Sequence, residues 1–255
     1  DYSKTNPEFP NPPRNTFLSS SGNPNLEFCL ATIDPSGNPT NGITRTSTTQ
    51  TNWDADDQGG WGSDGEANAM KKTSSGGIDS WDYQRYLNIW VCDLTNSQSG
   101  GMTLGYAYLP GLPSSSWNDQ TWKDGLVVDF QWFGTIQGAS GDSRTATHEI
   151  GHYLGLSHTF CDGGCCDNDD DNVDDTPLCY YNENGEDGPY FGPVTSNTNN
   201  NTCTMGWSSN LLDMDENFMA YSQNTWMFSN DQVNAMNATL NGYRSALKNS
   251  NVTVN

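Results

Sequence analysis

Three histidines at fixed spacing, with a glutamate beside the first, form the stretch of this sequence best suited to chemistry. They are His148, His152 and His158, all the histidines in the 255 residues, and Glu149 follows the first of them. On a helix, residues four apart share a face, so His148 and His152 can bind one metal ion. Glu149 then lies next to the metal and stays free to hold a water molecule. Gly155 can adopt a positive φ that ends the helix, and the chain then returns His158 as a third ligand.

Three nitrogen ligands leave one position of a tetrahedral zinc ion open, which is typical of a catalytic zinc site. Zinc lowers the pKa of a bound water to about 7 and polarises a carbonyl group. Glu149 is therefore expected to act as general base, taking a proton from the attacking water and passing it to the leaving amine. The alternative, core histidines that share this spacing by chance, requires every residue of the motif to coincide.

The stretch from His148 to His158 reads H-E-x-x-H-x-x-G-x-x-H and resembles the elongated motif of the metzincin metallopeptidases. Residues 217–222, Asn-Phe-Met-Ala-Tyr-Ser, resemble the methionine-containing turn that metzincins carry beneath the zinc. The sequence of this turn is similar to that of the pappalysin family, in its bacterial cytophagalysin and ulilysin-like branch. Further similar stretches are spread over most of the chain, at residues 26–35, 41–45, 86–91, 104–107 and 174–177.

The resemblance implies a zinc endopeptidase with one catalytic zinc ion and a protein or peptide as substrate. It implies that Met219 is a structural, polarisable floor under the histidines and not a ligand. It also implies that Tyr221 touches the zinc at rest and swings to the oxyanion during the reaction. The alternative for Tyr221 is a packed aromatic ring with a satisfied hydroxyl. By the family's strand order, residues 104–109 form the edge strand along which an extended peptide substrate binds.

Composition and charge limit which partners the protein can bind and in which compartment it is expected to act. The net charge of −21, from 31 acidic and 10 basic residues, makes nucleic acid and anionic membranes poor partners. No apolar run approaches the ~20 residues of a membrane span, and no signal peptide is visible. The chain is thus interpreted as the processed form of a secreted, extracellular protein. The leader missing from it is the natural place for a signal and for an inhibitory propeptide that is the partner before activation.

The predicted fold is α+β, a single metzincin-like catalytic domain over residues 1–255. Its upper half, about residues 1–155, is expected to contain a twisted, mostly parallel sheet and the active-site helix. Its lower half, about residues 156–255, shows little periodicity before a helix at residues 229–247, which Ser229 can cap. Because few ladders are expected there, disulfides and calcium are the candidates for stabilising the lower half. The predicted strands are residues 26–33, 43–49, 86–94, 104–109 and 126–130.

Five of the seven cysteines lie in the lower half, and their density indicates disulfides formed in an oxidising compartment. The resemblance implies two disulfides there, with Cys179 and Cys203 as members. Cys165 and Cys166 are adjacent and are not expected to pair with each other, and the choice between them stays open. A second zinc site is the alternative, although the spacing fits no C-x-x-C pair. The disulfide candidates are Cys161, Cys165, Cys166, Cys179 and Cys203.

Acidic residues at alternate positions in residues 167–175 suit a hard cation that takes six to eight oxygen ligands. The loop is not an EF-hand, because Leu178 stands where the twelfth-position glutamate is required. The resemblance also implies one or more structural calcium ions near residues 174–177. A solvated acidic loop is the alternative here, as it is for the acidic stretch at residues 52–66. The calcium candidates are Asp167, Asp169, Asp171, Asp174, Asp175 and Thr176.

Asp213, Asp215 and Glu216 come directly before the methionine turn, and they are candidates for the substrate pocket. An acidic wall near that turn would favour a basic residue after the scissile bond, as in several relatives. Two other functions stay open: a catalytically dead, calcium-dependent adhesion module, and a zinc hydrolase of small molecules. The intact Glu149 argues against the first, and the expected edge strand argues against the second.

Overall fold

The computed structural model describes most of the chain, and the described residues fall into two compact units. One, the sheet unit, comprises residues 26–154 and 239–255; the other, the loop unit, comprises residues 1–25 and 155–238. One of the three changes of unit falls at Gly155, the fixed glycine of the histidine motif. The described residues are 9–58, 65–98, 100–116, 118–134, 144–162, 171–181, 190–203 and 211–253.

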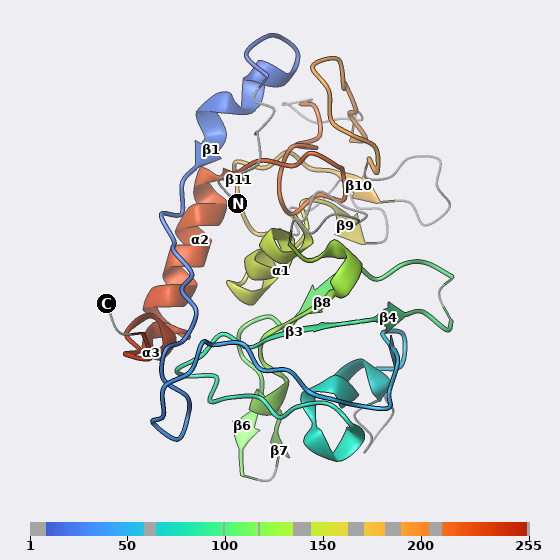
Figure 1. Cartoon of the computed structure of the whole chain (residues 1–255). Coiled ribbons are helices and arrows are strands. Elements are labelled where there is room, and N and C mark those ends of the chain that lie inside the picture. Colours follow the sequence, from blue (N-terminus) through green and yellow to red (C-terminus); the bar gives the residue numbers. More distant parts are fainter. Residues whose placement is uncertain are drawn as a thin grey trace. The chain divides into compact units, whose positions relative to one another are not determined.

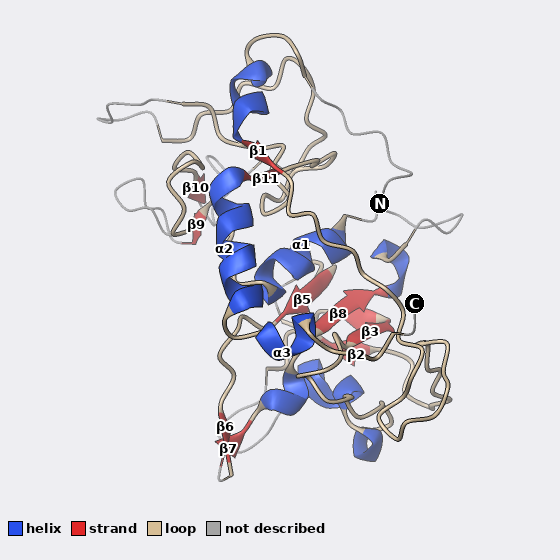
Figure 2. Cartoon of the chain, turned by 90° about the vertical axis from the view of Figure 1, so that its left-hand side faces the viewer, coloured by secondary structure: helices blue, strands red, loops and turns tan. Residues whose placement is uncertain are grey.

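A three-stranded sheet with one helix forms the centre of the sheet unit (Figures 1 and 2). Strand β3 (Ile89–Cys92) runs parallel to β8 (Leu126–Asp129), and β5 (Gly105–Ala107) runs antiparallel to β8 on its other side. The first three residues of β8 are apolar and fully buried, as expected for a middle strand. Helix α1 (Thr145–Tyr153) packs on β5 and β8, so the sheet fixes the helix that carries the histidines.

The predicted α+β class is confirmed, but the sheets are small and mixed in direction. Three of the five predicted strands are confirmed in shortened form, as β3 with β4 (Leu94–Thr95), β5 and β8. The strands predicted at residues 26–33 and 43–49 are wrong, because these stretches are irregular apart from one bridge between Ile33 and Pro39. β-branched residues favour a strand only where a neighbouring strand supplies ladder bonds and burial, and here Phe28, Leu30 and Ile43 stay exposed.

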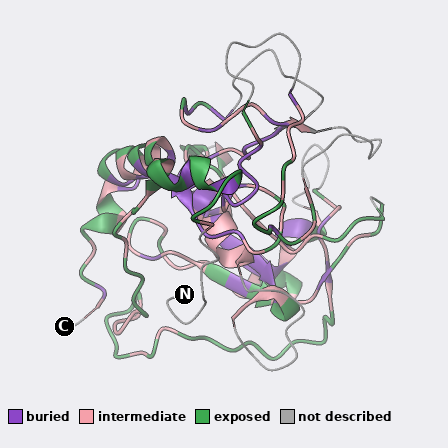
Figure 3. Ribbon diagram, turned by 90° about the horizontal axis from the view of Figure 1, so that it is seen from above, coloured by how far each residue is buried: buried purple, intermediate pink, exposed green. Residues whose placement is uncertain are grey.

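Shorter elements complete the sheet unit. β2 (Trp53–Asp54) pairs parallel with β4, and β6 (Ser114–Ser115) forms a hairpin with β7 (Asn118–Asp119). The long loops between elements are drawn largely in the colours of exposed and half-buried residues (Figure 3). The described part of this unit also contains four 3-10 helices, at Glu66–Lys71, Thr73–Ser75, Thr121–Lys123 and Phe130–Trp132.

The loop unit has only two-residue ladders among its described residues. β1 (Ser21–Gly22) pairs antiparallel with β11 (Phe228–Ser229), and β9 (Cys161–Asp162) pairs parallel with β10 (Tyr180–Tyr181). A 3-10 helix, Arg14–Ser20, precedes β1. Two-residue ladders satisfy few backbone groups, so side chains must supply much of the cohesion of this unit.

The helix predicted at residues 229–247 is present as two, α2 (Asn230–Asn241) and α3 (Ser245–Lys248). The predicted cap is confirmed, because Ser229 Oγ accepts a hydrogen bond from the backbone N–H of Gln232 at 3.1 Å. Val233, Met236 and Leu240 are buried, in keeping with the apolar face of the predicted helix. Among the described residues, no helix combines the length and the apolar stretch that a bilayer crossing requires.

Candidate metal centre

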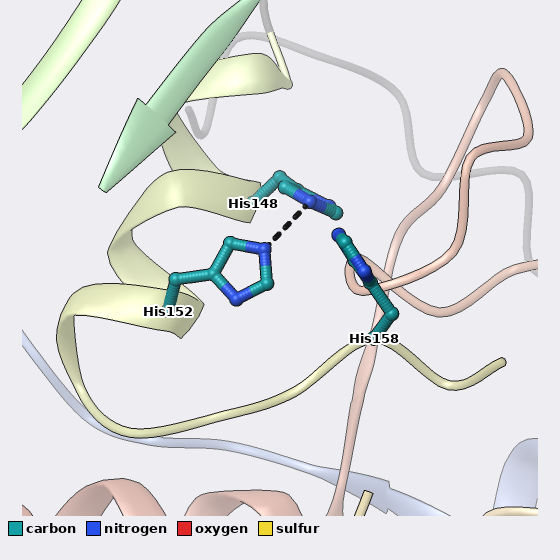
Figure 4. Close-up of side chains that lie close together, drawn as sticks. All are labelled: His148, His152 and His158. Atoms are coloured by element: carbon teal, nitrogen blue, oxygen red, sulfur yellow. Dashed lines mark hydrogen bonds between the residues drawn. The ribbon is translucent and has the colours of Figure 1, made fainter. Parts of the chain in front are cut away.

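Helix α1 brings the first two predicted ligands together. His148 and His152 lie one turn apart, and their Nε2 atoms are 3.1 Å from each other (Figure 4). The two rings stand nearly perpendicular, at 85°. Two nitrogens that share a tetrahedral zinc ion at about 2.0–2.1 Å lie about 3.4 Å apart, so this spacing fits one shared ion.

The third ligand arrives through the predicted glycine turn. Gly155 has φ of +96°, which confirms the left-handed conformation expected where α1 ends. The potential ligand atoms of His148, His152 and His158 lie within 4.8 Å of one another (Figure 4). In the part of the chain that the structure describes, this is the one group of three or more metal-ligating side chains so close together.

Glu149 is buried beside these histidines, and its Oε2 atom has no hydrogen-bond partner among the described residues. Burial raises the pKa of its carboxyl group to about 8. A buried carboxylate oxygen without a partner is costly, and a water molecule held at a bound zinc ion would satisfy it. The donor set and this orphaned oxygen therefore both fit a catalytic zinc ion.

Strand β5 passes directly over Glu149, at a glycine. A Cβ atom added to Gly105 would lie 3.2 Å from Glu149 Cγ, 3.0 Å from Thr145 Cγ2 and 2.9 Å from the carbonyl oxygen of Val127. Only glycine lets the strand approach the helix this closely without moving its neighbours. Gly105 thus helps to fix the glutamate, a role that the sequence did not reveal.

The methionine turn is built around a buried asparagine. Asn217 Oδ1 accepts a hydrogen bond from the backbone N–H of Met219 at 2.8 Å, and Asn217 Nδ2 donates to Gln232 Oε1 at 2.7 Å. Met219 is fully buried, and its carbonyl oxygen accepts a hydrogen bond from the backbone N–H of Thr159. The turn therefore supports the backbone immediately after His158.

Two aromatic rings surround His158. Phe160 is buried and stacks on the imidazole, with centroids 4.5 Å apart and planes only 9° from parallel. Tyr221 meets the same imidazole edge-on at 4.8 Å and also contacts Phe160. Sequence reasoning found Tyr221 but missed Phe160, although an aromatic residue two positions after the third histidine was a usable signal. Phe160 holds the plane of His158 and thereby directs its nitrogens.

The acidic triplet before the methionine turn is internal. Asp213, Asp215 and Glu216 are all buried, and the buried guanidinium of Arg14 lies against them. Arg14 forms an ion pair with Glu216, lies 3.7 Å from Asp215, and donates to the carbonyl oxygen of Asp213 at 2.9 Å. Burial raises the pKa of Asp213 and that of Asp215, the latter to about 7. These carboxylates already have a cationic partner, which removes the physical argument for their role as a wall that binds a basic substrate residue.

Three of the four described calcium candidates, Asp171, Asp175 and Thr176, form hydrogen bonds within the protein. Asp171 is buried, accepts the backbone N–H of Val173 at 3.1 Å and bonds to the Thr176 hydroxyl at 2.5 Å. Asp175 bonds to the Ser229 hydroxyl and accepts the backbone N–H of Asp231, so it caps α2 from outside the helix. Asp174 is exposed, while Asp167 and Asp169 lie outside the described residues.

The cysteine predictions have a mixed outcome. Cys179 is a buried free thiol, so its predicted place in a disulfide is wrong in this structure. Burial raises the pKa of that thiol well above its ordinary value. Cys203 is disulfide-bonded. Its partner lies outside what the structure describes, as do Cys165, Cys166 and the side chain of Cys161.

Comparison with known proteins agrees with this site. A family model described as pregnancy-associated plasma protein-A (Peptidase_M43) matches residues 72–241. The chain belongs to the pappalysin family. Among solved structures, mature mirolysin of Tannerella forsythia in complex with a cleaved peptide is 34% identical, with a TM-score of 0.72. That match covers 92% of this chain and 78% of mirolysin.

Curated relatives of this pappalysin are named extracellular metalloproteases. The one from Neurospora crassa is 33% identical over 192 residues, which are 72% of this chain and 57% of the relative. The one from Arthroderma benhamiae is 35% identical over 125 residues, 47% of this chain and 37% of the relative. The chain therefore spans between about a third and about three-fifths of the length of these relatives.

Proposed function

We propose that this chain is the catalytic part of a secreted zinc endopeptidase that hydrolyses peptide bonds in proteins. The observation that carries the proposal is the meeting of three imidazoles beside a buried glutamate whose Oε2 has no other partner. His148, His152 and His158 would hold the zinc ion, and Glu149 would hold the attacking water. Secretion is proposed because the curated relatives are named extracellular metalloproteases.

His148, His152 and His158 would hold a zinc ion that, when bound, would acidify a water molecule and polarise the scissile carbonyl. Glu149 takes a proton from the attacking water at a carboxylate oxygen and delivers it to the leaving amine nitrogen. Tyr221 is placed beside His158 with its ring partly exposed, so its hydroxyl is proposed to donate to the developing oxyanion. Phe160 and Met219 keep His158 in place and do not touch the substrate.

The substrate is proposed to bind as an extended strand along β5. β5 is the outer strand of the β3-β8-β5 sheet, and one of its edges lacks a ladder partner among the described residues. Main-chain pairing with such an edge binds a peptide with little regard to its side chains. Mirolysin has been solved both with a cleaved peptide and as promirolysin, which supports a peptide substrate and a propeptide partner here.

Structural calcium in the loop that contains Asp174 remains part of the proposal, with Asp167, Asp169, Asp171, Asp175 and Thr176 as the other predicted ligands. The bonds of Asp171 and Asp175 show that the described part of this loop is already organised by protein groups. A preference for a basic residue after the scissile bond remains a prediction. Cleavage of a peptide library, with and without a calcium chelator, tests both points.

The decisive test of the reaction is Glu149→Ala. This variant should retain zinc, since the three imidazoles are intact, while kcat falls by roughly 100-fold to 10,000-fold as expected for loss of a general base. Zinc content is measured by mass spectrometry and activity by cleavage of casein. Glu27→Ala, at an exposed glutamate, is the matched control and should keep full activity. Full activity in Glu149→Ala, or no zinc in freshly purified wild-type protein, would overturn the proposal.

A further inference from the structure

An exposed phenylalanine is fixed beside the tyrosine of the proposed site. Phe191 is 59% exposed and Tyr221 is 41% exposed, and their ring centroids lie 5.9 Å apart with the planes tilted by 36°. Tyr221 in turn contacts the ring of His158. The proposed metal ligand, the tyrosine and Phe191 therefore form a continuous row of rings that ends in an exposed apolar side chain.

The backbone around Phe191 is held tightly by a single residue. The Gln223 side-chain amide donates to the carbonyl oxygen of Phe191 at 3.2 Å, and the Gln223 backbone N–H donates to that of Gly192 at 3.0 Å. The backbone N–H of Val194 donates to the carbonyl oxygen of Gln223 at 3.1 Å. Gln223 comes two residues after Tyr221, so these bonds fix the phenylalanine to the segment that carries the tyrosine.

The neighbours of Phe191 explain why its ring stays in solvent. Val194 is buried and anchors the segment. The Tyr190 ring folds back over Gly192, where a Cβ atom would lie 2.5 Å from the Tyr190 hydroxyl oxygen. That hydroxyl donates to the carbonyl oxygen of Pro193 at 3.3 Å. The tyrosine thus packs on its own segment, whereas the phenylalanine between these anchors faces solvent beside Tyr221.

We infer that Phe191 is a specificity-determining residue that binds an apolar side chain of the peptide substrate near the scissile bond. A held, exposed aromatic ring gains free energy when a large aliphatic or aromatic side chain covers it. Its contact with Tyr221 places that side chain close to the reacting carbonyl. This inference rests on the proposed peptidase function. Phe191 is distinct from the acidic triplet, whose buried carboxylates pair with the Arg14 guanidinium inside the protein.

The test uses one fluorogenic peptide scaffold, varied among Ala, Leu, Phe, Asp and Lys at each of three positions on either side of the scissile bond. At one position the wild-type kcat/KM should be roughly 10-fold higher for Phe than for Ala, the scale of an apolar contact. Phe191→Ala should reduce that ratio to about 2, and Phe191→Leu should restore most of it. Phe28→Ala, at an equally exposed phenylalanine of the sheet unit, should leave the ratio unchanged.

Two results would overturn the inference: no apolar preference at any position in the wild type, or the same Phe-to-Ala ratio in Phe191→Ala. The Phe-to-Ala ratio would also stay the same if Phe191→Ala slowed cleavage of all peptides equally. Phe191 would then only support Tyr221 and would not determine specificity. Binding of the same peptides to Glu149→Ala, followed by fluorescence anisotropy, gives the ratio without turnover. Absence of cleavage would therefore count against the proposed reaction, while the ratio of Kd values still decides the role of Phe191.

Discussion

The sheet unit and the loop unit each bury one arginine, but the two arginines face different amounts of acid. In the sheet unit, Arg244 forms a two-pronged bond with Asp124, at 2.7 and 2.9 Å, and donates to the carbonyl oxygen of Tyr153 at 2.7 Å. In the loop unit, Arg14 faces Asp213, Asp215 and Glu216. Arg244 thus pairs with a single carboxylate, whereas Arg14 faces three buried acidic residues.

The difference follows from what else holds each unit together. The sheet unit has a three-stranded ladder and a packed helix, so Arg244 has only to fix the end of α1, at Tyr153. The described ladders of the loop unit are two residues long, and a buried charge cluster ties its 3-10 helix to the methionine turn. A buried ionic cluster specifies a geometry but contributes little net stability, because desolvation offsets the attraction. The raised pKa of Asp215 is a sign of that cost.

The largest effect is expected for Arg244→Ala. It leaves Asp124 buried without its cation and removes the guanidinium that lies 3.3 Å from the centroid of the Tyr153 ring. Loss of one partner of a buried pair should lower the free energy of unfolding by about 3–5 kcal/mol. Urea unfolding followed by tryptophan fluorescence measures it. Arg45→Ala, at an exposed arginine of the same unit, is the control, and a loss below about 1 kcal/mol in Arg244→Ala would break the comparison.

A second experiment neutralises one carboxylate beside each arginine, Asp124 beside Arg244 and Asp215 beside Arg14. Asp124→Asn should cost about 2–4 kcal/mol, because Arg244 then loses its only described carboxylate partner. Asp215→Asn should cost less than about 1 kcal/mol, because burial already favours the protonated form of Asp215. If both variants lost the same free energy of unfolding, Arg14 would need the charge of Asp215 as much as Arg244 needs that of Asp124.

The pH dependence of Asp215→Asn sharpens the result. The folded pKa of Asp215, about 7, lies above its ordinary value of 3.8, so between these pH values the folded protein binds more protons than the unfolded chain. The contribution of Asp215 to stability therefore falls as pH rises from about 4 to about 7. Relative to wild type, Asp215→Asn should become more stable over this range, as repeated urea unfolding at pH 5 and pH 8 would measure.

The same contrast explains what the sequence could predict. The meeting of the three histidines, the positive φ at Gly155 and the Ser229 cap were all predicted correctly, because each depends on residues close to one another in the sequence. Arg14 and Glu216 are 202 positions apart, and Arg244 and Asp124 are 120 apart. Such pairs leave no periodic pattern in a single sequence.

The two wrong strands and the burial of the acidic triplet escaped sequence analysis for related reasons. Residues 26–33 have the composition of a strand, but a ladder needs a partner that composition does not name. Asp213, Asp215 and Glu216 were visible as acidic residues in the sequence, whereas the arginine that faces them was not predicted. Of the site residues that were missed, Phe160 left a signal in its place two residues after His158, whereas Gly105 acts through a strand-to-helix contact that spacing does not encode.

A third buried cation, Lys71 of the sheet unit, supplies the most specific prediction. Its ammonium group donates to the carbonyl oxygen of Lys123 at 2.7 Å and lies over the rings of Trp90 and Tyr108. Aromatic faces and a carbonyl compensate a charge less completely than a carboxylate does, and burial lowers the pKa of Lys71 to about 7.

Because the unfolded chain keeps an ordinary lysine pKa of about 10.4, it binds more protons than the folded protein between about pH 7 and that value. The cost of burying Lys71 is therefore relieved as pH rises. Between pH 7 and pH 9, wild type should gain roughly 1–2 kcal/mol of unfolding free energy relative to Lys71→Met. Lys72→Met, whose native ammonium lies over the Trp122 ring, should show no such trend against wild type. Parallel pH curves for wild type and Lys71→Met would mean that the rings compensate this cation as fully as Asp124 compensates Arg244.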